Sequence, residues 1–232
     1  MDFEGRVMLV TGAANGIGEA ISRALAARGA RLLLADIDEA AGEALREALA
    51  AGGSECRFLR TDVADAAQAD ALVAVARDGF GRLDGAVDNA GVAHEQCRLH
   101  EADDATWQRM LAVNLTGVFN CLRAELRVML EQGGGSIVNM ASIAGIGGAP
   151  TLGPYAAAKH GVVGLTRTAA VEYGRHGIRV NAVCPSYTRT RMLDGIFAGA
   201  PDLAVKLEQS SPMKRFGEAG EVAATALWLS SA

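Results

Sequence analysis

The chain has 232 residues, of which half are hydrophobic and only 5% aromatic, and its formal net charge is −5. This length and composition favour a folded chain with a sizeable core and argue against disorder. The acidic balance excludes a basic surface for nucleic acid, no apolar run is long enough to span a membrane, and the first residues lack a signal-peptide pattern. Four scattered cysteines without metal-ligand spacing predict reduced thiols, a cytoplasmic protein and no metal site.

Short apolar runs alternate with helical patterns along the whole chain. The predicted strands cover 7–11, 31–36, 56–61, 83–88, 136–140 and 179–184, and the predicted helices cover 16–28, 38–51, 66–79, 103–131, 154–175 and 218–230. Such alternation predicts one α/β domain over 1–232, with a doubly wound parallel sheet. Right-handed crossovers predict the strand order 3-2-1-4-5-6, and ligands are expected at the carboxyl ends of the strands.

A glycine-rich turn joins the first predicted strand to the first helix. Residues 11–18 read Thr-Gly-Ala-Ala-Asn-Gly-Ile-Gly. The amides and the positive dipole end of a helix N-terminus form an anion site suited to a pyrophosphate. The glycines allow the tight turn, a close backbone approach and close packing of helix on strand. The predicted dinucleotide-binding residues of this turn are Gly12, Asn15, Gly16, Ile17 and Gly18.

Asp36 ends the second predicted strand, eighteen residues after Gly18. A carboxylate near this spacing binds the ribose hydroxyls of a dinucleotide and repels a 2′-phosphate. Residues 13–15 contain no basic side chain, and Ile37 follows the acid, so nothing nearby would compensate a phosphate. The sequence therefore favours NAD over NADP as cofactor.

Further candidate cofactor contacts follow the third and fourth strands. Asp62, with the adjacent Val63, could accept a hydrogen bond from an adenine amino group, although a helix N-cap would equally explain an Asp at this position. After the fourth strand comes Asp88-Asn89-Ala90-Gly91. Small residues there would let a cofactor lie against the backbone, so Asn89, Ala90 and Gly91 join the predicted cofactor site.

Tyr155 and Lys159 are the predicted centre of the chemistry. On a helix, positions i and i+4 share a face, so the ammonium lies beside the phenol and favours its ionised form. The phenol then becomes a general acid or base near neutral pH. Ser142, thirteen residues before Tyr155 and just past the fifth strand, could hold the substrate oxygen. Asn114 is a polar amide within an apolar segment and requires a partner there.

These motifs together resemble the short-chain dehydrogenase/reductase family, from about Gly5 to the last residue. The turn 11–18 matches the family's cofactor turn, and Asn89-Ala90-Gly91 matches its Asn-Asn-Ala-Gly segment, with Asp88 in place of the first Asn. The catalytic tetrad is matched by Asn114, Ser142, Tyr155 and Lys159. The nicotinamide end is matched by Pro185, Thr188 and Thr190, although Ser186 stands where the family has Gly.

The resemblance implies a role for each member of the tetrad. Tyr155 exchanges a proton with the substrate oxygen while hydride passes between the adjacent carbon and the nicotinamide. Ser142 orients and polarises that oxygen. Lys159 lowers the pKa of Tyr155 and holds the nicotinamide ribose, and Asn114 orders a water that links Lys159 to solvent.

The resemblance also implies a substrate lid and an oligomer. Substrate contacts are expected from 92–100, from 143–152 and from the loop after Pro185, with a lid at 187–211. The pocket is expected to be largely apolar, lined by Ile143, Ile146, Leu152, Tyr187, Met192, Ile196 and Phe197. The family's seventh strand has no counterpart in the sequence, which would leave 179–184 at the sheet edge. We therefore expect a homo-oligomer, a dimer, built through the helices 103–131 and 154–175.

The sequence thus predicts an NAD(H)-dependent oxidoreductase that interconverts a secondary alcohol and a ketone, with a small molecule as its partner. A 3-oxoacyl reductase is an alternative that fits Asp36 poorly. A protein that senses NAD without turnover would not need the Ser-Tyr-Lys set. A sugar-nucleotide epimerase or dehydratase would need a substrate domain for which the chain has no room.

Overall fold

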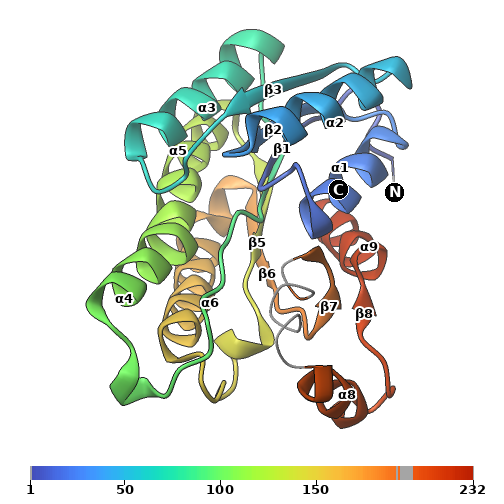
Figure 1. Ribbon diagram of the computed structural model, residues 1–232. Helices are drawn as coiled ribbons and strands as arrows, with labels where there is room; N and C mark the ends of the chain where they lie inside the picture. Colours follow the sequence, from blue (N-terminus) through green and yellow to red (C-terminus); the bar gives the residue numbers. More distant parts are fainter. Residues whose placement is uncertain (1, 192, 194–200, 232) are drawn as a thin grey trace.

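The computed structural model describes residues 2–191, 193 and 201–231 (Figure 1). A parallel sheet runs through the molecule, with the strand order β3-β2-β1-β4-β5-β6. Its strands are β1 (Val7–Thr11), β2 (Arg31–Asp36), β3 (Cys56–Arg60), β4 (Gly85–Asp88), β5 (Gly135–Met140) and β6 (Ile178–Val183). The predicted doubly wound fold and its strand order are confirmed.

Helices cover both faces of this sheet. One face carries α3 (Ala66–Phe80), α5 (Gly117–Gln132) and α6 (Gly153–Tyr173), and the other carries α1 (Gly16–Ala26), α2 (Glu39–Ala51) and α9 (Ala219–Ser230). All five residues of β1 are buried, because a strand in the middle of a sheet covered on both faces has no side exposed to water.

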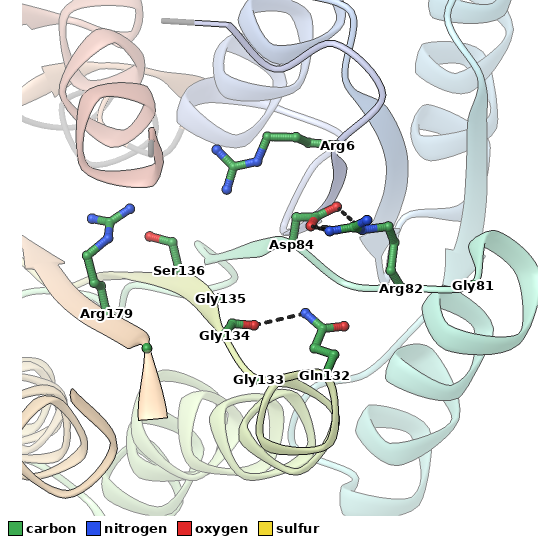
Figure 2. Close-up of a pocket in the computed structure, with 11 residues that line it drawn as sticks. Arg6, Gly81, Arg82, Asp84, Gln132, Gly133, Gly134, Gly135, Ser136 and Arg179 are labelled. Atoms are coloured by element: carbon green, nitrogen blue, oxygen red, sulfur yellow. Dashed lines mark hydrogen bonds and ion pairs between the residues drawn. The ribbon is translucent and has the colours of Figure 1, made fainter. Parts of the chain in front are cut away.

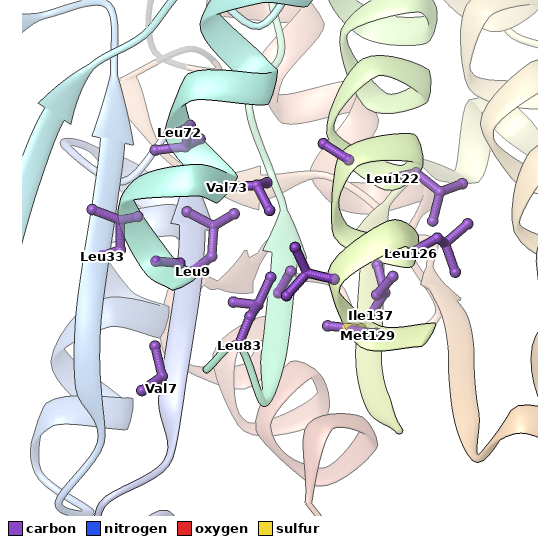
Figure 3. Packing of buried hydrophobic residues seen from close by; sticks show 14 of the residues in the cluster. Val7, Leu9, Leu33, Leu72, Val73, Leu83, Leu122, Leu126, Met129 and Ile137 are labelled. Atoms are coloured by element: carbon purple, nitrogen blue, oxygen red, sulfur yellow. The ribbon is translucent and has the colours of Figure 1, made fainter. Parts of the chain in front are cut away.

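The core is divided into two layers by the sheet. Val7 and Leu9 of β1 point into the layer beneath α3 and α5, whereas Met8 and Val10 point into the layer beneath α1 and α9. This alternation follows the two-residue period of a strand. Figure 3 shows the first layer, where Val7 and Leu9 lie among Leu33, Leu72, Val73, Leu83, Leu122, Leu126, Met129 and Ile137.

The helix predicted over 103–131 is interrupted. The structure has α4 (Asp104–Leu111), a π-helical turn (Ala112–Thr116) and then α5. The wider turn contains Asn114, whose side chain bonds to the backbone of Val92 outside the helix. A π turn of this kind often marks a functional position, because it displaces one residue from the regular helical ladder.

The predicted lid at 187–211 contains elements that the sequence pattern did not indicate. Thr188–Arg189 (β7) pairs in parallel with Gly217–Glu218 (β8), and α8 covers Pro201–Ser210. Tyr187 of this segment packs against Phe216, with ring centroids 6.2 Å apart. The expected pocket residues Met192, Ile196 and Phe197 lie outside the described residues.

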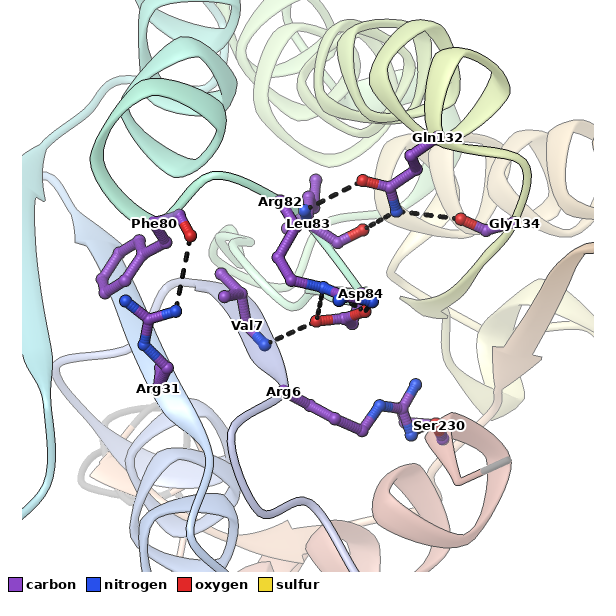
Figure 4. A network of polar contacts seen from close by, with 10 residues as sticks. All are labelled: Arg6, Val7, Arg31, Phe80, Arg82, Leu83, Asp84, Gln132, Gly134 and Ser230. Atoms are coloured by element: carbon purple, nitrogen blue, oxygen red, sulfur yellow. Dashed lines mark hydrogen bonds and ion pairs between the residues drawn. The ribbon is translucent and has the colours of Figure 1, made fainter.

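Polar contacts tie the strand starts together at the amino-terminal edge of the sheet (Figure 4). The Asp84 carboxylate accepts hydrogen bonds from Val7 N (2.8 Å) and from Arg82 Nε (2.9 Å). Arg6 Nη1 donates to Ser230 O (3.1 Å) at the end of α9. These bonds fasten β1, the start of β4 and α9 to one another.

A cavity of about 560 Å³ lies at the same amino-terminal edge (Figure 2). Its lining includes Arg6, Arg82 and Arg179, of which Arg179 donates through Nη1 to Leu229 O at 2.6 Å. All three guanidinium groups therefore have protein partners. The candidate site is found at the carboxyl ends of the strands, and the cavity lies at the opposite edge.

No helix in the described part of the chain is long and apolar enough to cross a membrane.

Candidate active site

The glycine turn brings three segments into close contact at the carboxyl end of β1. Gly12 (φ 60°) and Gly16 (φ 57°) adopt the left-handed conformation that favours glycine. A Cβ atom on Gly12 would lie 2.8 Å from Ala90 Cα, and one on Gly16 would lie 3.2 Å from Thr190 Cγ2. The turn therefore packs against the segment after β4 and against the segment after β6.

Asn89 and Thr11 hold the turn in place. Thr11 Oγ1 accepts hydrogen bonds from the backbone N–H groups of Asn89 (3.0 Å) and Ala90 (3.1 Å). In return, Asn89 Nδ2 donates to Thr11 O (3.2 Å) and Gly12 O (2.9 Å). Sequence reasoning did not assign this role to Thr11. The sequence feature that could have identified this role is a hydroxyl residue at the end of an otherwise apolar strand.

The Asp36 carboxylate lies beside the same turn. Its Oδ2 accepts a hydrogen bond from Ala14 N (2.9 Å), and its Oδ1 accepts one from Asp38 N (3.0 Å). These two amides fix the carboxylate at the carboxyl end of β2 without neutralising its charge. The neighbouring Ile37 is 58% exposed and supplies no positive charge.

Asp62 and Val63 follow β3 toward the same edge. Asp62 Oδ1 accepts a hydrogen bond from Ala64 N (3.0 Å), whereas the N-cap of α3 is Asp65, which accepts from Ala67 N (2.9 Å). The N-cap alternative for Asp62 is therefore wrong. Val63 is buried, and its carbonyl accepts a hydrogen bond from Asn120 Nδ2 (3.0 Å).

Asn114 is fully buried in the π-helical turn and satisfies the backbone of Val92. Its Oδ1 accepts from Val92 N (3.0 Å), and its Nδ2 donates to Val92 O (3.0 Å). A Cβ atom on Gly91 would lie 2.8 Å from Asn114 Oδ1 and 3.6 Å from Lys159 Nζ. Gly91 thus lies between two members of the predicted tetrad.

The other three tetrad members meet where β5 ends and α6 begins. The Tyr155 hydroxyl lies close to Ser142, whose Oγ accepts a hydrogen bond from Ala144 N (3.1 Å). Lys159 Nζ lies 5.7 Å from the centroid of the Tyr155 ring and donates to Met140 O (2.8 Å). The structure therefore brings together Ser142, Tyr155 and Lys159, with Asn114 on the far side of Gly91.

Burial has the largest effect on the pKa values of these groups. It raises the pKa of Tyr155, and the neighbouring Ser142 hydroxyl lowers this pKa in part. It also lowers the pKa of Lys159 to about 8. The sequence predicted that Lys159 would lower the pKa of Tyr155. In the structure the ammonium lies over the ring and bonds to the Met140 carbonyl, so the loss of water around the phenol has the larger effect.

The segment after β6 reaches the same edge. Pro185 O accepts a hydrogen bond from Ile143 N (2.9 Å), which joins this segment to the residue after Ser142. Thr188 Oγ1 donates to Ser186 O (3.0 Å), and the Thr190 side chain lies against Gly16. The predicted nicotinamide-end residues thus lie between the glycine turn and the Ser142 segment.

Comparisons with known proteins agree with this architecture. The family model described as enoyl-(acyl carrier protein) reductase matches residues 12–232. The levodione reductase of Leifsonia aquatica is 42% identical over 236 residues, which cover 99% of this chain and 88% of that protein. The cis-4-hydroxycyclohexanecarboxylate dehydrogenase of Sinomonas cyclohexanicum is 43% identical over 229 residues, which cover 99% of this chain and 90% of that protein.

A solved structure shows the same fold along the full chain. The crystal structure of an NAD⁺-bound xylitol dehydrogenase superposes with a TM-score of 0.95 and 31% identity, covering 100% of this chain and 94% of that one. The sequence motifs, the fold and the similar proteins therefore indicate the same family. The chain belongs to the short-chain dehydrogenase/reductase family of oxidoreductases, which act on CH–OH groups.

Proposed function

We propose that this oxidoreductase uses NAD(H) to interconvert a secondary alcohol and a ketone, with Tyr155 as the proton donor and acceptor. The observation that carries the proposal is the half-buried Tyr155 close to Ser142, beside the Lys159 ammonium and near Gly91. A phenol placed in this way can give or take one proton, which is what a carbonyl oxygen needs when its carbon gains or loses hydride.

The residues around the glycine turn fit a dinucleotide. No side chain from Asn15 caps the first turn of α1, so its amides are available to a pyrophosphate. A Cβ atom on Gly12 would clash with the backbone of Ala90, and one on Gly91 would clash with Asn114 Oδ1, so both positions need glycine for residues 89–91 to lie against the turn. Asp36 is suited to accept the ribose hydroxyls, and its charge would repel a 2′-phosphate. These features support NAD over NADP.

The chain's own residues would handle the proton and place the oxygen. In the direction of reduction, the Tyr155 hydroxyl donates its proton to the substrate oxygen, and the Ser142 hydroxyl holds that oxygen beside it. In the direction of oxidation, the ionised phenol takes the alcohol proton. Asn114 holds the Gly91–Val92 backbone against Lys159. When bound, the nicotinamide would supply or accept the hydride.

The substrate we propose is an alicyclic secondary alcohol or the corresponding ketone. The names of two similar proteins specify cyclohexane or cyclohexadiene alcohols, the hydroxycyclohexanecarboxylate dehydrogenase and a 2,5-dichloro-2,5-cyclohexadiene-1,4-diol dehydrogenase. In this chain Ile143 and Ile146, which follow Ser142, are 47% and 59% exposed. Apolar side chains left open beside the catalytic hydroxyl would suit a hydrocarbon ring.

The test is turnover of substituted cyclohexanols with NAD⁺, and of cyclohexanones with NADH, by wild type and by Tyr155→Phe. The variant keeps the ring and removes the proton donor, so we expect turnover to fall by about 10²–10⁴-fold, with NADH affinity nearly unchanged. Tyr173→Phe, at the far end of the same helix, is the matched control and should keep wild-type turnover. If Tyr155→Phe retains most of its activity, the proposed role of Tyr155 is wrong.

We also infer a homodimer, a lid and a reducing compartment. Phe119 of α5 and Val171 of α6 are 40% and 85% exposed, which supports the association of two copies through α4, α5 and α6. The segment 187–211 contains the nicotinamide-end residues Thr188 and Thr190, which supports its role as a substrate lid. All four cysteines are unpaired, which supports a cytoplasmic location.

A further inference from the structure

Two carboxyl groups are buried in contact with each other beneath the cofactor turn. Asp88 ends β4 and is 2% exposed, and Glu125 of α5 is 0% exposed. Their side chains lie close enough to interact with one another, and the Cys121 thiol, one helical turn before Glu125, lies close to Asp88. Neither carboxyl group belongs to the tetrad.

No N–H or hydroxyl group in the described part of the chain donates to the four carboxyl oxygens. From β1, Thr11 faces Asp88 in register, but its hydroxyl oxygen is occupied by two backbone amides. From β5, Asn139 faces Asp88 and donates to Thr166 instead, at 2.8 Å. From α3, Ala69 packs with Cys121 and brings no charge.

Two neighbouring buried carboxyl groups without another donor can satisfy each other only if one of them carries a proton, because an ionised carboxylate only accepts. Two ionised carboxylates in contact, with no cation beside them, would also be expensive to bury. Burial accordingly raises the pKa of Asp88 to about 7 and raises the pKa of Glu125 well above its usual range. Burial also raises the pKa of Cys121, which keeps that thiol protonated.

The pair adjoins the segment that shapes the cofactor site. Asp88 directly precedes Asn89, whose backbone bonds to Thr11 and whose side chain bonds to Gly12 O. Any displacement of Asp88 away from Glu125 therefore moves the strand end that carries residues 89–91. A second negative charge in the pair would cause such a displacement, because like charges in contact repel each other strongly in a buried site.

We propose that Asp88 and Glu125 are positioning residues that share a proton in the folded enzyme, and that this protonated pair holds residues 89–91 where the dinucleotide binds. The second half of this inference rests on the proposed function. Loss of the shared proton to solvent at alkaline pH separates the carboxylates, loosens the segment and weakens cofactor binding.

The first test is thermal unfolding without cofactor, for wild type and for the double variant Asp88→Asn/Glu125→Gln. Carboxyl groups with raised pKa values bind protons in the folded state that the unfolded chain releases above about pH 4. Wild-type stability therefore falls as pH rises above that value, until the folded groups also ionise. The double variant lacks both carboxyl groups and does not lose stability in this way. The difference between its melting temperature and that of wild type should therefore shift in favour of the variant from about pH 5 to about pH 8.

Glu131→Gln is the matched control, since Glu131 lies on the same helix but is exposed. Its melting temperature should differ from that of wild type by the same amount at every pH. The single variant Glu125→Gln replaces the double variant if the latter does not fold. If the difference in melting temperature between wild type and the Asp88/Glu125 variants does not change with pH, the two groups do not share a proton and the proposal is wrong.

The second test is NADH binding, followed by nicotinamide fluorescence over the same pH range. Wild-type affinity should fall at alkaline pH by up to about tenfold per pH unit more than that of the double variant. Lys159 is present in both proteins, so its own ionisation cancels in the comparison. Equal pH dependence of NADH affinity in the two proteins would overturn the link to the cofactor. If neither protein bound NADH at any pH, the proposed function would fail, whereas the melting data would still decide whether the proton is shared.

Discussion

Thr11→Val removes one oxygen atom from the contact between the glycine turn and the segment after β4. Thr11 is 1% exposed, and its Oγ1 accepts two backbone hydrogen bonds, from Asn89 and Ala90. Valine has nearly the same shape, so packing is retained while both amides lose their acceptor. An unsatisfied buried amide costs about 1–3 kcal/mol. Because residues 89 and 90 are only partly buried, water can reach one amide, and we expect a loss of about 1–3 kcal/mol in total.

Urea unfolding measures this loss, and NADH titration measures its consequence for the site. We expect weaker NADH binding by Thr11→Val, because residues 89–91 are no longer held against Gly12. Thr11→Ser is the control, since it keeps the acceptor and removes one methyl group, at a cost of about 0.8 kcal/mol. The serine variant should bind NADH like wild type. Normal NADH binding by Thr11→Val would refute the idea that this hydroxyl positions the cofactor segment.

Two further predictions concern charge. Burial lowers the pKa of Lys159 to about 8, so its ammonium is lost as pH rises through that value, and wild-type NADH affinity should fall with it. In Lys159→Met the part of this fall that is due to the ammonium should be absent from a fluorescence titration, so NADH affinity should fall less steeply near pH 8 than in wild type; an unchanged fall would exclude Lys159 as a source. Asp36→Ala combined with Ile37→Arg removes the repulsive carboxylate and supplies a guanidinium, so the ratio of NADP to NAD turnover should rise at least about tenfold, whereas wild type prefers NAD. Equal use of both cofactors by wild type would contradict this interpretation of Asp36.

The parts of the fold that depend on local pattern were predictable from the sequence. Strand positions followed from short apolar runs, and the glycine turn followed from residues whose spacing fits only a strand, a tight turn and a helix start. The order of the strands then followed from the handedness of the crossovers. Because the carboxyl ends of parallel strands share one edge, Ser142 and Tyr155 could be placed near the turn before any contact was known.

Features that depend on long-range contact were not predictable in this way. The identity of the α3 N-cap, Asp65 and not Asp62, depends on where the helix starts to within three residues, which pattern does not resolve. The raised pKa of Tyr155 depends on how much water the fold removes, and not on the spacing to Lys159. The contact of Asp88 with Glu125 joins residues from separate elements, and each acid alone looks like an ordinary polar residue.

The π-helical turn at Asn114 makes this part of the site sensitive to the number of residues in the chain, as well as to their identity. A π turn holds one residue more than the regular ladder needs, so deleting a single residue from 112–116 would let α4 and α5 join as one continuous α-helix. Each residue of an α-helix turns the chain by about 100°. Such a deletion would therefore swing the Asn114 amide away from Val92 while leaving almost every side chain of the site chemically intact. Insertions and deletions in this stretch are thus a route to inactive proteins that keep the full set of catalytic residues.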